Sequence, residues 1–276
     1  MEPATKGVPV NLLSWVENAK PTLKPPVGNR MMYDGAQFQI MIIGGPNQRD
    51  DFHVEKGEEL FVQLEGDMNL DVMQEGKRVA IPIKEMDLFV LPLMVPHSPQ
   101  RYENTIGLVI ERVRTSKEMD TLRWYKKGTN KIDYEETFHC DDLGTQIKEV
   151  ILRYFGMKDA GKIEGEFGEA DAEPKIHTPD PAPLSQILEN APAGGITSFL
   201  KSEFTVSIAK GCVQSPLPDA NGGDYFLWQL KGSSMVGSQG MTENEVMLLP
   251  SMPGAPVSLD QGEGSLLLIV TNHALV

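Results

Sequence analysis

Residues 53–66 of this chain read HVEKGEELFVQLEG, and this stretch, together with its later repeat, decides the fold. Residues 225–232 read YFLWQLKG and repeat the apolar strand and its closing glycine. A second strand with its proline also occurs twice, as DLFVLP at 87–92 and as VMLLP at 246–250. The pattern indicates an old duplication of one β-rich unit.

The two copies differ at the positions that could bind a metal. When the copies are laid over each other, Glu59 falls on Tyr225 and His97 falls on Ala255. The scaffold is therefore kept twice and the candidate ligands only once, which predicts a single metal site in the N-terminal half.

Composition limits the possible classes of function. The chain has 276 residues, 40% of them hydrophobic and 23% charged, which is typical of a globular protein with a real core. Its net charge of −14 disfavours nucleic acid and anionic membranes as partners. The sequence shows neither a long apolar run nor a signal-peptide pattern, and it has two distant cysteines, Cys140 and Cys212. We therefore expect a protein of the reducing cytosol.

Short apolar segments separated by Gly, Pro, Asp and Asn predict a mainly β fold, as closed antiparallel barrels or sandwiches. The expected strands are 37–43, 60–64, 68–73, 79–83, 88–91, 108–113, 204–209, 226–230, 246–249 and 266–270. We expect few helices. One is predicted at 12–18, and another runs from a cap at Asp141 or Asp142 to a stop at Gly156.

The domain organisation follows from a change in composition. Residues 158–183 are rich in Gly, Ala, Glu and Pro and are predicted to form a linker. We expect an N-terminal domain over 1–157 that carries the metal and the catalysis. A second, degenerate domain without metal ligands is expected over 184–276.

His53, Glu59 and His97 are the candidate metal ligands. Two imidazoles and one carboxylate form the facial triad that holds non-haem Fe(II) and leaves coordination positions open. Each residue alone is more simply explained as a surface or structural side chain. Their joint occurrence in the β-rich segments, and their loss from the second copy, favour the metal site.

These motifs resemble the cupin superfamily, which implies a bicupin of two jelly-roll-like β-barrels with a few short helices. Glu59 and Gly66 match the end of the first cupin motif, and Pro92 and His97 match the second. The chain departs from the usual pattern because only His53 precedes the glutamate, where a His-x-His pair is common. Asp87 and Arg101 also stand where glycine and asparagine are usual.

Longer motifs resemble the 3-hydroxyanthranilate 3,4-dioxygenases, in their animal-type, two-domain form. The matching segments are GGPNQR at 44–49, GEE at 57–59, QLEGDM at 63–68, VPHSPQR at 95–101 and CDDLGTQ at 140–146. The resemblance implies an Fe(II) enzyme that uses dioxygen to open the ring of 3-hydroxyanthranilate. The product would be 2-amino-3-carboxymuconate semialdehyde, the precursor of quinolinate in the kynurenine route to NAD. It also implies a monomer.

The resemblance assigns roles to the site residues. His53, Glu59 and His97 would hold Fe(II), and Glu59, Arg101 and Glu111 would contact the substrate. Arg49 would lie near dioxygen. An arginine suits the substrate's carboxylate because its planar fork matches that group. On composition alone, Arg49 and Arg101 would be surface arginines, and Glu111 would face solvent and pair with Arg112 or Arg114.

Two other functions remain open on the residues themselves. The chain could be a non-catalytic bicupin that binds a small anion. It could also be a cupin that holds Zn or Mn for an isomerase or hydrolase reaction, because two histidines and a glutamate do not dictate iron.

Overall fold

The computed structural model describes residues 2–24, 28–33, 35, 37–163, 176–220, 222–251 and 254–272. The chain divides into two compact units. The N-terminal unit comprises Thr22–Arg30 and Met41–Ala182, and the C-terminal unit comprises Met1–Pro21, Met31–Ile40 and Pro183–Val276. The first segments of the chain thus make most of their contacts with the C-terminal half. Residues 164–175 of the predicted linker lie outside the described part, and the predicted domain boundaries stay a prediction.

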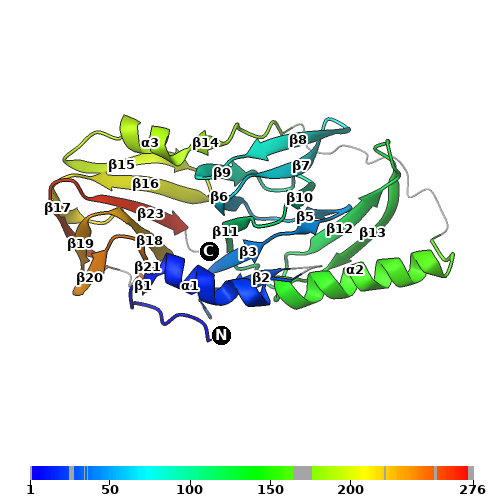
Figure 1. The fold of residues 1–276 in the computed structure, drawn as a ribbon, viewed down its shortest axis with the longest axis horizontal. Helices are drawn as coiled ribbons and strands as arrows, with labels where there is room; N and C mark the ends of the chain where they lie inside the picture. The colour runs from blue at the N-terminus through cyan, green and yellow to red at the C-terminus, as the bar shows by residue number, and fades with distance from the viewer. Residues whose placement is uncertain are drawn as a thin grey trace. The chain divides into compact units, whose positions relative to one another are not determined.

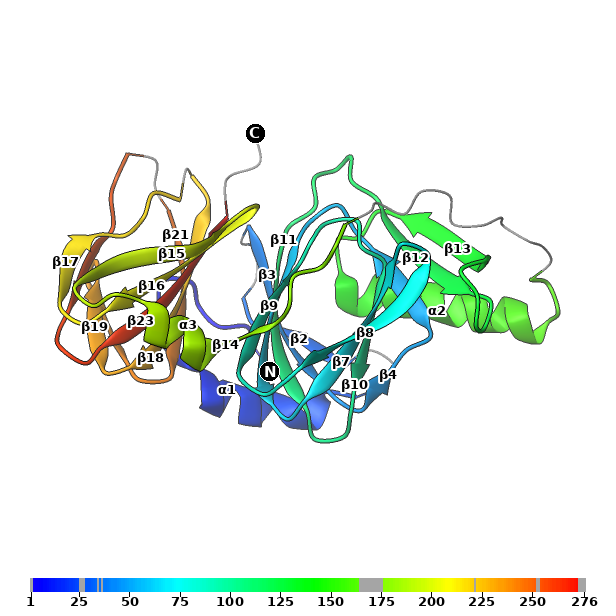
Figure 2. The same ribbon diagram turned by 90° about the horizontal axis from the view of Figure 1, so that it is seen from above.

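The N-terminal unit is built from two facing antiparallel sheets, seen in the described residues (Figures 1 and 2). One has the order β13-β12-β5-β10-β7-β8, with β4 added beside β10, and the other has the order β14-β9-β6-β11-β3-β2. Their bounds are β2 Asn29–Met31, β3 Phe38–Gly44, β4 Asn47–Gln48, β5 Asp51–Val54, β6 Glu59–Glu65, β7 Met68–Gln74, β8 Lys77–Ile83, β9 Asp87–Leu91, β10 His97–Arg101, β11 Ile106–Arg112, β12 Asp120–Tyr125, β13 Ile132–Phe138 and β14 Ala182–Pro183.

The C-terminal unit repeats this arrangement. Within the described ranges its sheets have the orders β1-β21-β18-β23-β16-β15 and β17-β22-β19-β20. The bounds are β1 Val10–Asn11, β15 Gly195–Lys201, β16 Phe204–Lys210, β17 Val213–Pro216, β18 Asp224–Lys231, β19 Ser233–Val236, β20 Gln239–Thr242, β21 Glu245–Pro250, β22 Ser258–Gln261 and β23 Leu266–Asn272. The predicted mainly β, jelly-roll-like fold is confirmed, with facing sheets in place of closed barrels.

The repeated glycines turn the chain at the same place in both units. Gly66 separates β6 from β7 with φ +63°, and Gly232 separates β18 from β19 with φ +70°. A positive φ strains residues that carry a Cβ atom, so glycine is favoured at both turns. The structure therefore contains the scaffold duplication that the sequence indicates.

The strand register corrects one part of the predicted overlay. Arg101 pairs with Met68, two residues beyond Gly66, and Gln261 pairs with the residue two beyond Gly232. Gln261 is thus the counterpart of Arg101, which makes Val257 rather than Ala255 the counterpart of His97. The overlay was wrong by two residues because the connection between β21 and β22 is two residues longer than that between β9 and β10.

Apolar side chains replace the candidate ligands in the C-terminal unit. Leu217 and Tyr225 are buried in its hydrophobic core, and Val257 packs against that core. Tyr225 stands at the position of Glu59, and Val257 at that of His97. Among the described residues this interior is a packed core, and a single metal site in the other unit stays a prediction.

Two of the described α-helices follow predicted local signals, and the third, α3 at Leu184–Asn190, was not predicted and has no side-chain cap at Pro183. The predicted first helix is α1, Leu12–Ala19. The second predicted helix is α2, Leu143–Asp159, and the side chain of Asp142 caps it by accepting a hydrogen bond from the Gly144 amide. Its predicted stop at Gly156 was wrong. The helix continues for three more residues because an interior glycine costs only about 1 kcal/mol, and in this added part Nζ of Lys158 lies 5.3 Å from the ring centroid of Tyr154.

The N-terminal part of α2 is buried against the N-terminal unit. The ring of Tyr154 stacks on Trp124 of β12, with centroids 4.1 Å apart, and Ile147 and Leu143 are buried about two and three turns earlier on the helix. In the part of the chain that the structure describes, no helix has the length and apolar character needed to cross a membrane.

Candidate metal centre and substrate cavity

Three strands bring the candidate ligands together. His53 lies in β5 and His97 begins β10, where the two residues are paired across the ladder, while Glu59 begins β6 in the facing sheet. All three are buried, with exposed fractions of 4% or less. One potential ligand atom from each lies within 4.8 Å of the other two. The predicted set therefore forms one compact group of donors.

Three carboxylates also have oxygen atoms within 4.8 Å of one another, but an arginine already binds to two of them. They are those of Glu55, Glu59 and Glu111. Arg114 donates from Nη1 to Oε2 of Glu111 at 2.6 Å, and from Nη2 to Glu55. The guanidinium thus already pairs with two of these three carboxylates, and the His53, Glu59 and His97 set is the one left for a metal ion.

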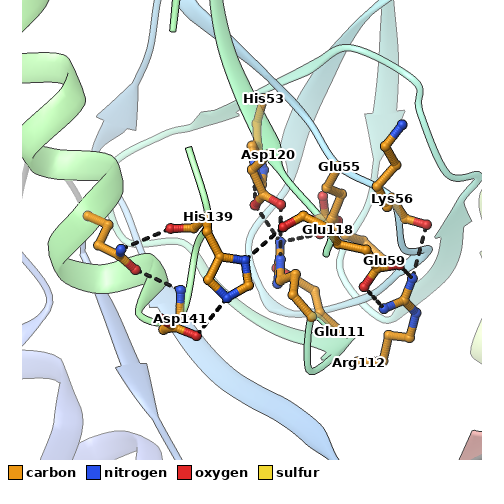
Figure 3. A network of polar contacts seen from close by, with 12 residues as sticks. His53, Glu55, Lys56, Glu59, Glu111, Arg112, Glu118, Asp120, His139 and Asp141 are labelled. Atoms are coloured by element: carbon orange, nitrogen blue, oxygen red, sulfur yellow. Dashed lines mark hydrogen bonds and ion pairs between the residues drawn. The ribbon is translucent and has the colours of Figure 1, made fainter. Parts of the chain in front are cut away.

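Each imidazole is oriented by a hydrogen bond on one ring nitrogen. Nε2 of His53 is 2.8 Å from Oδ2 of Asp120, and Nδ1 of His97 donates to the carbonyl of Val95 at 3.0 Å. Figure 3 shows Asp120 beside His53. Such partners on the outer nitrogen are typical of metal-binding histidines, since they fix the ring and leave the other nitrogen for the ion.

The Glu59 carboxylate is incompletely satisfied. Its Oε1 atom lies 2.7 Å from Nε2 of His97, yet it accepts no hydrogen bond of acceptable geometry within the described residues. A buried oxygen without a proper partner is costly, and a metal ion between these two atoms would satisfy it. The donor set of two nitrogens and one carboxylate therefore fits a metal with open coordination positions.

Burial and charge set the protonation of the ligands. Burial lowers the pKa of His53 despite the opposing Asp120 carboxylate, which favours the neutral imidazole that binds metals. Burial opposes the charged forms of Glu59 and His97 as well, but their mutual attraction outweighs it. That attraction lowers the pKa of Glu59 and raises the pKa of His97.

The candidate ligands open onto one cavity of the N-terminal unit. The other side chains that line it are Asn29, Met41, Ile43, Asn47, Arg49, Phe61, Pro99, Arg101, Val109, Glu111, Leu143 and Ile147. Most of this wall is apolar, and its charged groups lie near the candidate ligands. The structure thus brings all six predicted site residues, Arg49, His53, Glu59, His97, Arg101 and Glu111, into one place.

Arg101 is more deeply buried than Arg49, the other arginine that lines the cavity. It is only 1% exposed, and its Nη1 donates to Oε1 of Gln63 at 3.2 Å. Its Nε and Nη2 atoms have no hydrogen-bond partner among the described residues. Burial lowers the pKa of Arg101 to about 10, so it remains a cation at neutral pH. Two unpaired donors on a buried cation are suited to an anionic ligand.

A glycine makes room for this guanidinium. A Cβ atom on Gly107 would lie 2.4 Å from Nη1 of Arg101 and 3.0 Å from Oε1 of Gln63. The ladder places Leu267 at the corresponding position of β23 in the C-terminal unit, where the counterpart of Arg101 is Gln261. The space for a buried arginine therefore exists in one unit only.

Arg49 differs from Arg101 in its pairing. Its Nε atom donates to both carboxylate oxygens of Asp51 at 3.1 Å, and its Nη2 also binds Asp51. The charge of Arg49 is therefore already balanced within the protein. The expected role of Arg49 near dioxygen stays a prediction.

Glu111 is buried and faces the cavity. The solvent-facing alternative is therefore wrong, although one of its proposed partners, Arg114, does bind Glu111. Burial raises the pKa of Glu111 to about 7 despite that arginine. The sequence reasoning missed Asp120, Glu55 and the cluster role of Arg114, because each depends on contacts between distant strands.

Comparisons with known proteins agree with this geometry. The family model described as 3-hydroxyanthranilic acid dioxygenase matches residues 5–155. The 3-hydroxyanthranilate 3,4-dioxygenase of Bos taurus is 36% identical, over 95% of this chain and 96% of its own length. That of Nematostella vectensis is 37% identical, over 96% and 99% respectively.

The chain belongs to the 3-hydroxyanthranilic acid dioxygenase family. The predicted family and its dioxygenase class are thereby confirmed. A cupin protein from Leptotrichia buccalis, at 12% identity and a TM-score of 0.54, covers 98% of both chains. An oxalate decarboxylase of Bacillus subtilis, at 13% identity and a TM-score of 0.51, covers 99% of this chain and 78% of its own. These structures confirm the bicupin fold.

Proposed function

We propose that this protein uses Fe(II) and dioxygen to open the ring of 3-hydroxyanthranilate, giving 2-amino-3-carboxymuconate semialdehyde. That product closes to quinolinate, which places the reaction in the kynurenine route to NAD. The observation that carries the proposal is the cavity itself. It holds two histidines and a glutamate beside a buried arginine, two of whose donors have no partner in the described part of the chain and could bind an anion.

The substrate's chemistry matches these groups one by one. It is an aromatic ring with adjacent hydroxyl and amino groups and a carboxylate. His53, Glu59 and His97 would hold Fe(II), which supplies open positions for the two adjacent groups and for dioxygen. Arg101 would bind the carboxylate through Nε and Nη2, and this contact would fix the orientation of the ring.

Glu111 would handle a proton of the substrate. With a pKa of about 7, its carboxyl group is divided between both protonation states at neutral pH, as a proton acceptor should be. The Glu111 carboxylate lies near the candidate ligands, where the hydroxyl or amino group of the substrate would be placed. Phe61, Val109 and Ile147 line the remaining wall and would keep water from the ring.

The decisive experiment combines metal analysis with oxygen uptake. Purified protein reconstituted with Fe(II) should bind one equivalent, consume dioxygen with 3-hydroxyanthranilate and form an absorbing semialdehyde. Fully iron-loaded protein that takes up no oxygen would contradict the proposal. Activity with Zn or Mn on other substrates would instead favour the isomerase or hydrolase alternative.

A variant separates the enzyme from a non-catalytic anion-binding bicupin. His97→Ala removes a buried ligand and should abolish both iron retention and turnover. A non-catalytic anion-binding module would keep its affinity for the anion in this variant, and it has no turnover to lose. We further propose that the protein is a cytosolic monomer, which subcellular fractionation and sedimentation would test.

A further inference from the structure

Arg114 lies at the centre of a buried charge cluster beside the candidate metal centre. It binds both oxygens of Asp120, at 3.2 Å from Nε and 2.9 Å from Nη2, and it also binds Glu111 and Glu55. The three carboxylates come from β12, β11 and the connection between β5 and β6. One guanidinium therefore joins three separate segments.

Each of these carboxylates also adjoins the candidate centre. Asp120 holds Nε2 of His53, and Glu111 pairs with Glu59 across the ladder. Glu55 and Glu59 have carboxylate oxygens within 4.8 Å of each other. Arg114 thus contacts carboxylates that in turn adjoin two of the three candidate ligands, His53 and Glu59.

We propose that Arg114 is a positioning residue, which holds His53 and Glu59 in metal-binding geometry through Asp120 and Glu55. This inference rests on the proposed metal centre. Without the cation, buried carboxylates this close together would repel one another and turn away from the ligands they orient. The Arg114 guanidinium makes four hydrogen bonds to these carboxylates from three nitrogen atoms, whereas a lysine ammonium has three donors on one nitrogen, so lysine cannot replace it.

Arg112 offers a matched control. It lies two residues earlier, is equally buried, and makes its own bidentate pair with Glu118, at 2.6 Å from both Nη1 and Nη2. It also donates to the carbonyl of Lys56 at 3.2 Å. Arg112→Lys therefore measures the general effect of weakening a buried arginine pair.

The test compares Arg114→Lys with Arg112→Lys in the full-length protein. Metal affinity is measured by competition with a chelator, and the site geometry by the visible spectrum of Co(II)-loaded protein. We expect Arg114→Lys to weaken metal binding by roughly 10- to 100-fold and to change the Co(II) spectrum. Arg112→Lys should leave both unchanged, even where its melting temperature falls by a similar amount.

Equal metal affinity and identical spectra for the two variants would overturn the inference. If Arg114→Lys does not fold, Asp120→Asn replaces it, and unchanged metal affinity in that variant would likewise overturn it. Where Arg114→Lys and Asp120→Asn both fold, the variant that carries both substitutions should lose less free energy of metal binding than the sum of the two single losses. The reason is that Arg114 acts on His53 through Asp120. Strictly additive losses would contradict a pathway through Asp120.

The outcomes separate this inference from the proposed function. A wild-type protein that binds no metal would contradict both. A wild-type protein that binds Fe(II) and turns over, beside an Arg114→Lys variant that behaves like Arg112→Lys, would contradict only the positioning role.

Discussion

Replacing Arg101 by methionine should harm substrate binding while leaving stability almost unchanged. Among the described residues, the arginine makes one side-chain hydrogen bond, to Gln63, and its Nε and Nη2 donors are buried without a partner. Methionine has a similar length and removes the cost of those unpaired donors. The lost hydrogen bond to a charged group, about 1.5–3 kcal/mol, is therefore offset by an unpaired-donor cost of similar size. We expect the free energy of unfolding to change by about 1 kcal/mol or less.

The effect on the substrate should be much larger. If Arg101 pairs with the carboxylate, its loss removes one side of a buried charged pair, worth about 2–5 kcal/mol. At 1.36 kcal/mol per factor of ten, KM should rise by roughly 30- to 5,000-fold. Steady-state oxygen uptake would measure this rise, and urea unfolding would measure stability. 2-Aminophenol, which lacks the carboxylate, should lose little or no affinity in the variant.

Arg49→Met is the control for this experiment. It leaves the buried Asp51 carboxylate without its arginine, so it should destabilise the protein by about 3–5 kcal/mol. The reasoning is refuted if Arg101→Met destabilises as strongly as Arg49→Met, or if it leaves KM for 3-hydroxyanthranilate unchanged.

Three further predictions follow from individual contacts. Gly107→Ala should raise KM in the same direction as Arg101→Met, because its Cβ atom would displace the guanidinium; unchanged kinetics would show that the cavity can relax. Arg112 lowers the pKa of Glu118 to about 2, so this pair contributes stability above the ordinary value of 4.5 and loses it as the pH falls toward 2. Wild type and Glu118→Gln should therefore converge in unfolding free energy over that interval, and a constant difference would refute the pairing. Finally, a thiol reagent should label exposed Cys212 in the native protein and reach Cys140 only after unfolding, because burial raises the pKa of Cys140 to about 12; two fast-reacting thiols would contradict this.

Much of the fold could be predicted because its signals are local. Apolar segments such as those of β6 and β18 show strand character by themselves, and Gly66 and Gly232 mark the turns that follow. The strands that carry the histidines were harder to find. β5 is short, and β10 is polar and contains Pro99, so both lack the apolar pattern of a buried strand. They form because neighbouring strands pair with them.

The sequence by itself determined the family and the candidate ligands, since the motifs around His53, Glu59 and His97 mark the family and are absent from the second copy. Only the tertiary structure decided how their charges are arranged. It pairs Arg49 with a carboxylate, leaves two donors of Arg101 without a partner among the described residues, and places Arg114 among three carboxylates from separate segments. It also showed that Val257, and not Ala255, replaces His97. The physical reason is that pairing and burial depend on which strands become neighbours, and that is a property of the folded chain.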